Sequence, residues 1–252
     1  MLLKGKFQNG RSGERTRKLL VVVQYTASMI LLCGTLIVFA QLNYMRRQSL
    51  GVRTDRILVV KFPGPTEGMK IKMEAMRKAI RKLPLVSKVT CSGSVPGEEV
   101  AMFLSNRRTH DALKQNRLYE MLSCDPDYMD AYGLELVAGR GFSEDYGDDV
   151  NKLVINETAA RTLGYTDYES VIGEEISVET IEEPMQVIGV VKDYHQQALN
   201  RNYTPIMLFH KDKIDWIPQR YISIVMKPGD SLELVSQISE IWTTYFLSLI
   251  HI

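Results

Sequence analysis

The sequence is poor in the residues from which metal sites and disulfide scaffolds are built. Its 252 residues include three cysteines and four histidines, and no CxxC, HxxxH or HExxH spacing would bring metal ligands together. Cys33 lies in an apolar run, so only Cys91 and Cys124 could pair, and two unpaired thiols are the preferred interpretation. The sequence therefore predicts no metal, no cofactor and no disulfide framework.

Motifs for nucleotide hydrolysis and for hydrolytic catalysis are also missing. There is no Walker A pattern, so any ATP hydrolysis must belong to another subunit, and there is no GxSxG pattern. The one cluster that suggests catalysis is Asp193-Tyr194-His195. Alternate residues of an extended segment share a face, so Asp193 could orient the imidazole of His195. Because no nucleophile has a recognisable motif nearby, a structural histidine is the preferred interpretation and no enzymatic activity is expected.

Charge is distributed unevenly along the chain. Residues 1–56 carry ten Lys or Arg and two acidic residues, a net charge of +8, whereas the remaining residues carry 21 basic and 28 acidic groups, a net charge of −7. A basic head around an apolar run indicates contact with anionic lipid headgroups rather than with nucleic acid.

Residues 19–42 contain no charged side chain, and 18 of these 24 residues are apolar. As a helix they would extend ~36 Å, enough to cross a hydrocarbon core of ~30 Å. The run is apolar on every face, unlike a buried core helix, and too long for a signal peptide. Its polar and small residues are typical of a helix that packs against other helices. Six basic residues before the span, against four after it, favour a cytoplasmic N-terminus by a small margin.

After residue 56 the pattern mixes strands and helices. A strand at 57–62, an amphipathic helix at 69–83 and a strand at 86–92 predict a βαβ unit, and residues 94–115 read as irregular. Further expected elements are strands at 117–124, 152–155, 175–180, 185–192, 206–209 and 221–227, and helices at 127–132, 156–163 and 231–245.

The change of pattern along the chain predicts an α+β extracytoplasmic domain with two lobes. Long amphipathic helices near both ends indicate that 57–92 and 203–245 pack together as a porter-like lobe that contains the βαβ unit. Short strands and turns between them indicate a smaller inserted lobe. The expected organisation is a cytoplasmic basic segment at 1–18, a transmembrane helix at 19–42, a connector at 43–56, the domain at 57–246 with its inserted lobe at approximately 97–200, and an uncertain tail at 247–252.

Four stretches carry a resemblance to a known family. The first is LLKGKF before the span with QLNYMRRQSLGVRTDRILVV after it, and the second is DYM followed by YGLELVAGRGF. The third is VINETAARTLG with Ile172-Gly173 after it, and the fourth is VIGVVKDYHQQAL with Pro205 beyond. In order and spacing, these stretches resemble the periplasmic core domain of MacB-type permeases of the FtsX superfamily, over nearly the whole chain.

The motif positions also suit structural roles. Gly133 is expected to end a helix in the left-handed conformation, Arg140 to clamp carbonyls or a carboxylate, and Asn156 to cap a helix. Gly189 is expected where a neighbouring chain comes close. The structural motif residues are Tyr128, Gly133, Gly139, Arg140, Phe142, Asn156, Glu157, Gly164, Gly173, Gly189, Asp193 and His195.

The resemblance implies a permease subunit of an ABC transporter in the bacterial inner membrane. It implies a separate ABC ATPase subunit, a permease homodimer or heterodimer, contact with membrane lipid, and a periplasmic domain that transmits ATPase-driven motion to substrate or to a periplasmic adaptor. Family permeases carry three further spans after this domain, so a fragment of a longer permease is expected. The alternative is a membrane-anchored extracytoplasmic sensor or ligand-binding module, which the mere 18 residues before the span disfavour.

Overall fold

The computed structural model describes residues 11–64, 68–110, 115–146, 149–214, 217 and 219–246. The chain forms two compact units, which divide between Ser49 and Leu50. The tail expected at 247–252, the stretch LLKGKF and the first ten residues of the basic segment lie outside the described residues.

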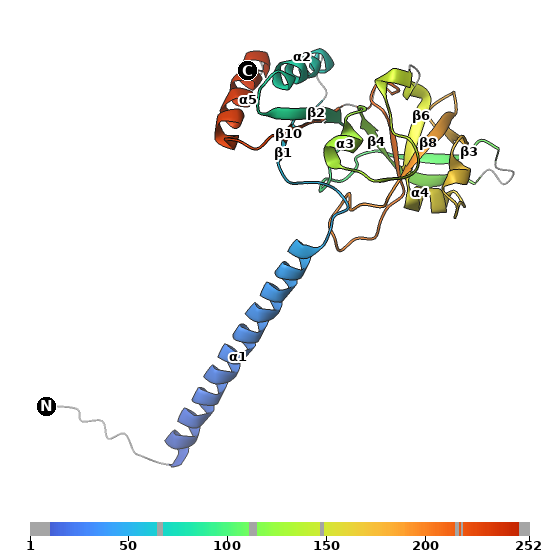
Figure 1. Ribbon diagram of the computed structural model, residues 1–252. Helices are drawn as coiled ribbons and strands as arrows, with labels where there is room; N and C mark the ends of the chain where they lie inside the picture. The colour runs from blue at the N-terminus through green and yellow to red at the C-terminus, as the bar shows by residue number, and fades with distance from the viewer. Residues whose placement is uncertain are drawn as a thin grey trace. The chain divides into compact units, whose positions relative to one another are not determined.

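The first unit is the helix α1 (Arg11–Arg47), drawn in blue in Figure 1. Its stretch Gly13–Met45 has the length and apolarity of a membrane-spanning helix. Residues 43–47, expected in the connector, continue the helix because no glycine or proline interrupts the chain there. The hydroxyls of Thr26 and Thr35 each donate to the backbone carbonyl four residues earlier, at 2.8 Å. These two polar side chains are therefore satisfied within the helix.

The second unit is a mixed α/β domain built on one ten-stranded sheet. Its elements in chain order are β1 (Ile57–Lys61), α2 (Met69–Arg81), β2 (Val86–Ser92), β3 (Phe103–Arg108), β4 (Arg117–Cys124), α3 (Tyr128–Tyr132), β5 (Leu136–Gly139), η1 (Glu144–Tyr146), η2 (Asp149–Asn151), β6 (Lys152–Asn156), α4 (Glu157–Thr162), η3 (Glu169–Val171), β7 (Glu175–Val178), β8 (Met185–Val191), β9 (Ile206–His210), β10 (Tyr221–Met226) and α5 (Ser231–Phe246).

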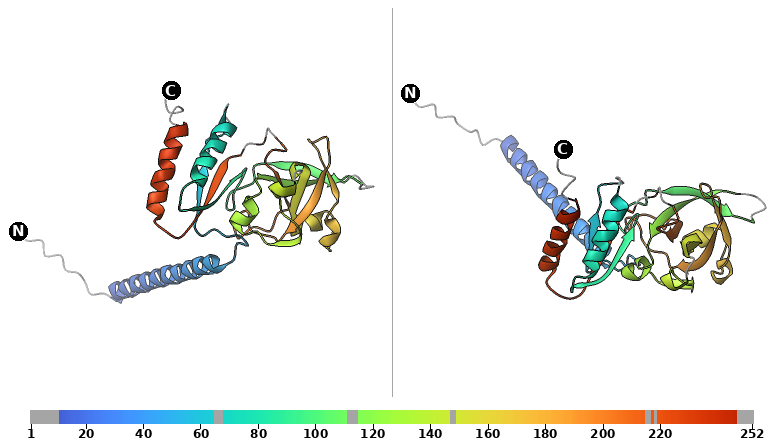
Figure 2. Two further views of the ribbon diagram at one scale, coloured as in Figure 1. Left: turned by 45° about the horizontal axis from the view of Figure 1, so that its top comes forward. Right: turned by 90° about the horizontal axis from the view of Figure 1, so that it is seen from above.

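Three strands and two helices form what we call the outer layer: β1, β10, β2, α2 and α5. β10 pairs antiparallel with both β1 and β2, so the predicted βαβ unit is split by a strand from the far end of the chain. The helices α2 and α5 lie side by side against these strands (Figures 1 and 2). Their apolar faces bury Met76 and Ile80 of α2 and Leu234 and Ile238 of α5 in one core.

Six strands close into a ring, in the order β4, β3, β7, β8, β6, β9 and back to β4. The β4–β9 and β6–β8 pairs are parallel, and the other four are antiparallel. β5 pairs with β8 beside the ring. Side chains such as Tyr119, Ile155 and Phe209 form the core of the ring. β2 meets β4 at the pair Ser92 and Cys124, so the outer layer and the ring share one sheet.

Two strands are missed by the sequence pattern. β3 lies in the stretch expected to be irregular, because its polar residues Ser105, Asn106, Arg107 and Arg108 hide the apolar alternation. It is a strand because β4 and β7 supply hydrogen-bonding partners on both of its edges. β5 covers four residues for which the sequence pattern predicted no element, and it ends at the motif glycine Gly139.

The placement of β9 also differs from expectation. Residues 203–245 were expected to join 57–92, but β9 pairs with β4 and β6 in the ring, and only β10 and α5 join the outer layer. A five-residue apolar strand does not reveal its partners, because pairing is decided by the rest of the fold. The two soluble-domain cysteines, Cys91 and Cys124, are free and buried.

Candidate functional site

The chain that leads into the domain, residues 50–56, is fixed by backbone hydrogen bonds to two of the motif regions. The N–H of His195 donates to the carbonyl of Leu50 at 2.9 Å, and the N–H of Arg53 donates to the carbonyl of Tyr132 at 2.7 Å. We call residues 50–56, the helix α3 and the segment 192–196 together the joint. The joint brings the second and fourth motifs to the point where the domain begins.

Two glycines allow close packing in the joint. Gly51 has φ +74°, and a Cβ there would lie 3.1 Å from the Cα of Tyr194. Gly133 has φ +62°, ends α3 in the left-handed conformation and lies against the side chain of Arg53. Residues other than glycine rarely adopt a positive φ of this size, so both positions favour glycine.

The fourth motif is bound to the third at Asp193. Its carboxylate accepts from the N–H of Thr158 at 2.9 Å, from the Thr158 hydroxyl at 2.8 Å and from the guanidinium of Arg161. In return, the carboxylate of Glu157 accepts from the N–H of Asp193 at 2.9 Å. Because Thr158 lies in the first turn of α4, Asp193 satisfies one of the N–H groups that a helix start leaves without a partner. The two motifs are therefore reciprocally hydrogen-bonded.

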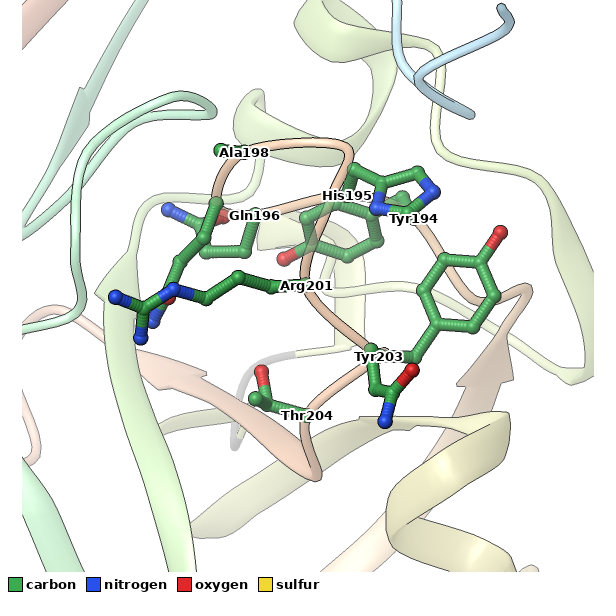
Figure 3. A pocket seen from close by; sticks show the side chains of 9 residues that line it. Tyr194, His195, Gln196, Ala198, Arg201, Tyr203 and Thr204 are labelled. Carbon is green, nitrogen blue, oxygen red and sulfur yellow. The ribbon is translucent and has the colours of Figure 1, made fainter.

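His195 has a different environment from the one the sequence suggested. The side-chain hydrogen bonds of Asp193 in the described residues go to Thr158 and Arg161. The imidazole of His195 packs against the ring of Tyr203, with the two ring centroids 4.6 Å apart and the ring planes tilted by 39° (Figure 3). The expected orientation of His195 by Asp193 is therefore not the arrangement in the structure.

Asn156 joins the start of α4 to the start of β9. Its Oδ1 accepts from the N–H of Ala159 at 2.9 Å and from the N–H of Ile206 at 3.0 Å, and its Nδ2 donates to the carbonyl of Thr204 at 2.8 Å. The side chain is buried, so these bonds are shielded from water. Gly164, with φ +97°, follows the other end of this helix.

Arg140 clamps a carboxylate and a carbonyl. Its guanidinium donates two hydrogen bonds to Asp149, at 2.7 and 2.8 Å, and one to the carbonyl of Gly141 at 2.9 Å. The N–H of Ser143 also donates to Asp149, at 2.8 Å. The hydrogen bonds from Arg140, with that from Ser143, lower the pKa of Asp149 despite its burial. The ring of Tyr146 lies under the guanidinium, with the centroid 4.0 Å away.

The other motif positions are packing positions. A Cβ on Gly139 would lie 2.2 Å from the carbonyl oxygen of Ile188, and a Cβ on Gly189 would lie 2.1 Å from that of Arg140, so β5 and β8 can approach only with glycine at both positions. Gly173 has φ +92° and precedes β7. Tyr128 and Phe142 are buried together in a second core.

Gln196 is a buried residue that the sequence did not single out beyond its place in the fourth motif. The Nε2 of Gln196 donates to the carbonyls of Val95 at 2.8 Å and Glu98 at 3.0 Å. The backbone carbonyl of Gln196 accepts from the N–H of Gly97 at 2.8 Å. It therefore holds the loop after β2 against the joint. The only local signal was a polar residue next to the Asp-Tyr-His cluster.

Asp125, directly after β4, is a second residue without a sequence signal. Its buried carboxylate accepts from the N–H of Cys91 at 2.9 Å, from the hydroxyl of Thr90 and from Arg77 of α2 at 3.1 Å. Burial raises the pKa of Asp125, and the hydrogen bonds and Arg77 oppose part of that rise. The contact links α2 of the outer layer to the end of a ring strand.

A small hollow lies beside the joint, lined by 194–198 and 201–204 (Figure 3). Its volume is about 10 Å³, about the space that one water molecule needs. Organic ligands occupy pockets of roughly 300–1,000 Å³. This hollow is therefore too small for an organic ligand. Within the described residues, no group of three or more His, Cys, Asp or Glu side chains is arranged to hold a metal ion.

A family model for the MacB-like periplasmic core domain matches residues 27–240. The match includes the joint, the ring and the outer layer up to residue 240 in α5. The chain belongs to the family of MacB-like periplasmic core domains.

Three solved structures share the fold of this MacB-like domain. The periplasmic region of MacB from Actinobacillus actinomycetemcomitans is 17% identical with a TM-score of 0.52, over 77% of this chain and 85% of that one. A domain of a protein described as a permease, from Porphyromonas gingivalis, is 22% identical with a TM-score of 0.52, over 76% and 84%. The extracellular domain of the noncanonic ABC-type transporter YknZ from Gram-positive bacteria is 16% identical with a TM-score of 0.50, over 74% and 91%. Comparison with curated proteins finds no match.

Proposed function

We propose that this MacB-like domain and its helix form part of an ABC transporter permease that transmits motion driven by a separate ATPase subunit to a substrate or a periplasmic partner. The observation that carries the proposal is the joint. The chain that follows α1 makes backbone hydrogen bonds to the DYH segment and to α3 within its first few residues. A displacement of α1 would therefore pull on residues 50–56, which are hydrogen-bonded to the DYH segment and to α3.

From the joint, hydrogen bonds lead into both parts of the domain. Tyr132 of α3 bonds through its hydroxyl to the hydroxyl of Ser223 in β10, at 2.7 Å, and the N–H of Met226 in the same strand donates to the carbonyl of Arg56 at 2.9 Å. These contacts lead into the outer layer. The bonds of Asp193 to α4 lead into the ring. Because packed interiors deform little, these links favour movement of the domain as a body.

The proposed setting is the bacterial inner membrane, with the domain on the periplasmic side and the N-terminus in the cytoplasm. The basic residues before the apolar run support this orientation, and they would also contact anionic lipid. The proposed partners are the ATPase, a second permease subunit, and a periplasmic adaptor or substrate. No chemistry is assigned to the domain. The small hollow gives the alternative, a ligand-binding sensor, no support.

An insertion at the joint tests the proposal in the complete transporter. Six Gly or Ser residues between Ser49 and Leu50 should add slack between α1 and the joint without entering the domain. We expect ATP turnover to continue, while ATP-dependent changes in hydrogen exchange within 50–56 and 192–196 disappear. The same insertion between Glu182 and Glu183, in the exposed β7–β8 turn, should preserve those changes. Unchanged ATP-dependent exchange in the first variant would contradict transmission through the joint.

A further inference from the structure

Glu120 has a buried carboxyl group and lies outside the joint. It lies in β4, where it pairs with Phe103 of β3 and Ile206 of β9, and its side chain is 2% exposed. Its neighbours in the strand, Tyr119 and Met121, belong to the core of the ring. Side chains alternate along a strand, so Glu120 lies on the opposite face, against the segment 194–204 that follows β8.

One residue of that segment, Gln197, contacts Glu120. The Nε2 of Gln197 donates to Oε1 of Glu120 at 3.4 Å. The other two polar atoms, Oε2 of Glu120 and Oε1 of Gln197, are both buried and have no hydrogen-bond partner among the described residues. Both are acceptors when the carboxyl is ionised, so they cannot bond to each other. One proton on Oε2 makes it a donor, and the acid and the amide can then exchange two hydrogen bonds.

The surroundings of Glu120 favour that proton. Burial raises the pKa of Glu120, a hydrogen bond with the side chain of Thr204 opposes part of that rise, and the charge of Glu99 adds to it. Arg201 lines the hollow beside this pair, and its guanidinium lies 4.0 Å from the carboxylate of Glu99. Tyr194, whose pKa is also raised by burial, interacts electrostatically with Glu120. His195 lines the same hollow, but its ring packs against Tyr203.

We propose that Glu120 is protonated in the folded domain and pairs with Gln197 through two hydrogen bonds, as a proton-dependent latch on the segment 194–204. The segment starts at the joint, where His195 binds Leu50 and Gln196 binds the loop after β2. Ionisation removes one of the two bonds and leaves a charge in a buried site. The latch therefore makes the joint firmer in acid and looser as the pH rises.

The sign of the pH effect follows from the raised pKa. The stabilisation is fully present below the ordinary pKa of glutamate, and it is lost as the pH rises through the raised pKa of the folded state. Glu120→Gln keeps an acceptor and a donor in place of the acid, so it reproduces the protonated pair without a titrating group. Relative to Glu120→Gln, the unfolding constant of the wild type should increase about tenfold per pH unit within that window.

The experiment compares the full chain and its variants in detergent from about pH 4 to about pH 9, the range that spans the ordinary glutamate pKa. Denaturant unfolding gives the ratio of unfolding constants, and Glu182→Gln, on the exposed β7–β8 turn, is the matched control with no effect expected. Infrared spectra should show the carbonyl stretch of a protonated carboxyl below the raised pKa of Glu120 in the wild type, and the corresponding band should be missing in Glu120→Gln. A ratio that does not change with pH, or the absence of that band, would overturn the protonation.

Hydrogen exchange of 194–204, corrected for the intrinsic effect of pH, separates a latch from a merely buried acid. Protection of the segment should be the same at every pH in Glu120→Gln, should fall in the wild type as the pH rises, and should be reduced at every pH in Gln197→Leu, which removes both hydrogen bonds. If Gln197→Leu leaves the protection of the segment as it is in Glu120→Gln, the pair does not hold the segment and the latch is wrong.

Discussion

At the scale of single residues, Arg140 and Asp149 form an ion pair whose anion is buried more deeply than its cation. The exposed fractions of the side chains are 5% for Asp149 and 33% for Arg140. Asp149 accepts two hydrogen bonds from Arg140 and one from the N–H of Ser143, so the loss of Arg140 would leave a buried carboxylate with one of these three donors. The pair therefore stabilises the fold mainly by supplying hydrogen bonds to a buried carboxylate, and less by the attraction between two charges at the surface.

We predict that Asp149→Asn lowers the free energy of unfolding by about 1–3 kcal/mol near neutral pH, the usual cost of a broken hydrogen-bond set to a charged group. Because the folded state lowers the pKa of Asp149, the stabilisation is present above the ordinary aspartate pKa and is lost as the pH falls through the lowered value. The difference between wild type and variant should therefore shrink in acid. Thermal melting of the full chain in detergent measures it. Asp145→Asn, at an exposed neighbour, is the control, and an equal loss there would contradict the clamp.

At the scale of elements, the short helix α4 depends on residues outside itself. Six residues are too few for a helix to be stable alone. Asn156 and Asp193 accept from two N–H groups of its first turn, and Ala159 and Ala160 are buried on its inner side. The helix is therefore held in place by the two motifs that meet at its start.

We predict that Asp193→Ala frees the first turn of α4 and lowers the free energy of unfolding by about 1–3 kcal/mol, because the Thr158 N–H loses its acceptor in a partly buried place. Hydrogen exchange should speed up in 157–162 and in 192–196, since the two segments hold each other. Thr243→Ala, whose hydroxyl only bonds back to the carbonyl of Glu240 in α5, is a control for loss of a side-chain hydrogen bond. Exchange in 157–162 that stays at the wild-type rate would contradict the interdependence.

At the scale of the whole molecule, the proposed orientation across the membrane rests on a small excess of basic residues before the apolar run. We predict that Ser231→Cys, at the exposed start of α5, reacts with a membrane-impermeant thiol reagent from the periplasmic side. The native cysteines of the domain should stay silent while it is folded, because Cys91 and Cys124 are buried and burial raises the pKa of both thiols. The wild type without Ser231→Cys is the control for them. Labelling of Ser231→Cys from the cytoplasmic side alone would reverse the orientation and remove the basis of the proposed function.

The local sequence was sufficient for several parts of the site. The roles of residues at helix ends can be predicted from the local sequence. An Asn before a helix accepts a hydrogen bond from the first turn, as Asn156 does. A Gly after a helix adopts a positive φ, as Gly133 and Gly164 do. Arg140 was recognised as a clamp, but its partner Asp149 was not, because the sequence does not state which carboxylate a guanidinium will meet. The apolar run was equally evident, because its length alone suits a membrane.

Other features were decided only by the tertiary structure. The closure of the ring, the place of β9 and the strand β3 depend on pairing between segments far apart in the chain, and a short strand does not specify its neighbours. Glu120 and Asp125 look like ordinary acidic residues in the sequence, and burial gives them their altered pKa values. The local sequence pattern predicts helix ends, the periodicity of apolar residues and the length of a hydrophobic run, because those are properties of residues close together in the chain. Strand order and the protonation of buried acids belong to the assembled fold, because they arise from contacts between distant parts of the chain.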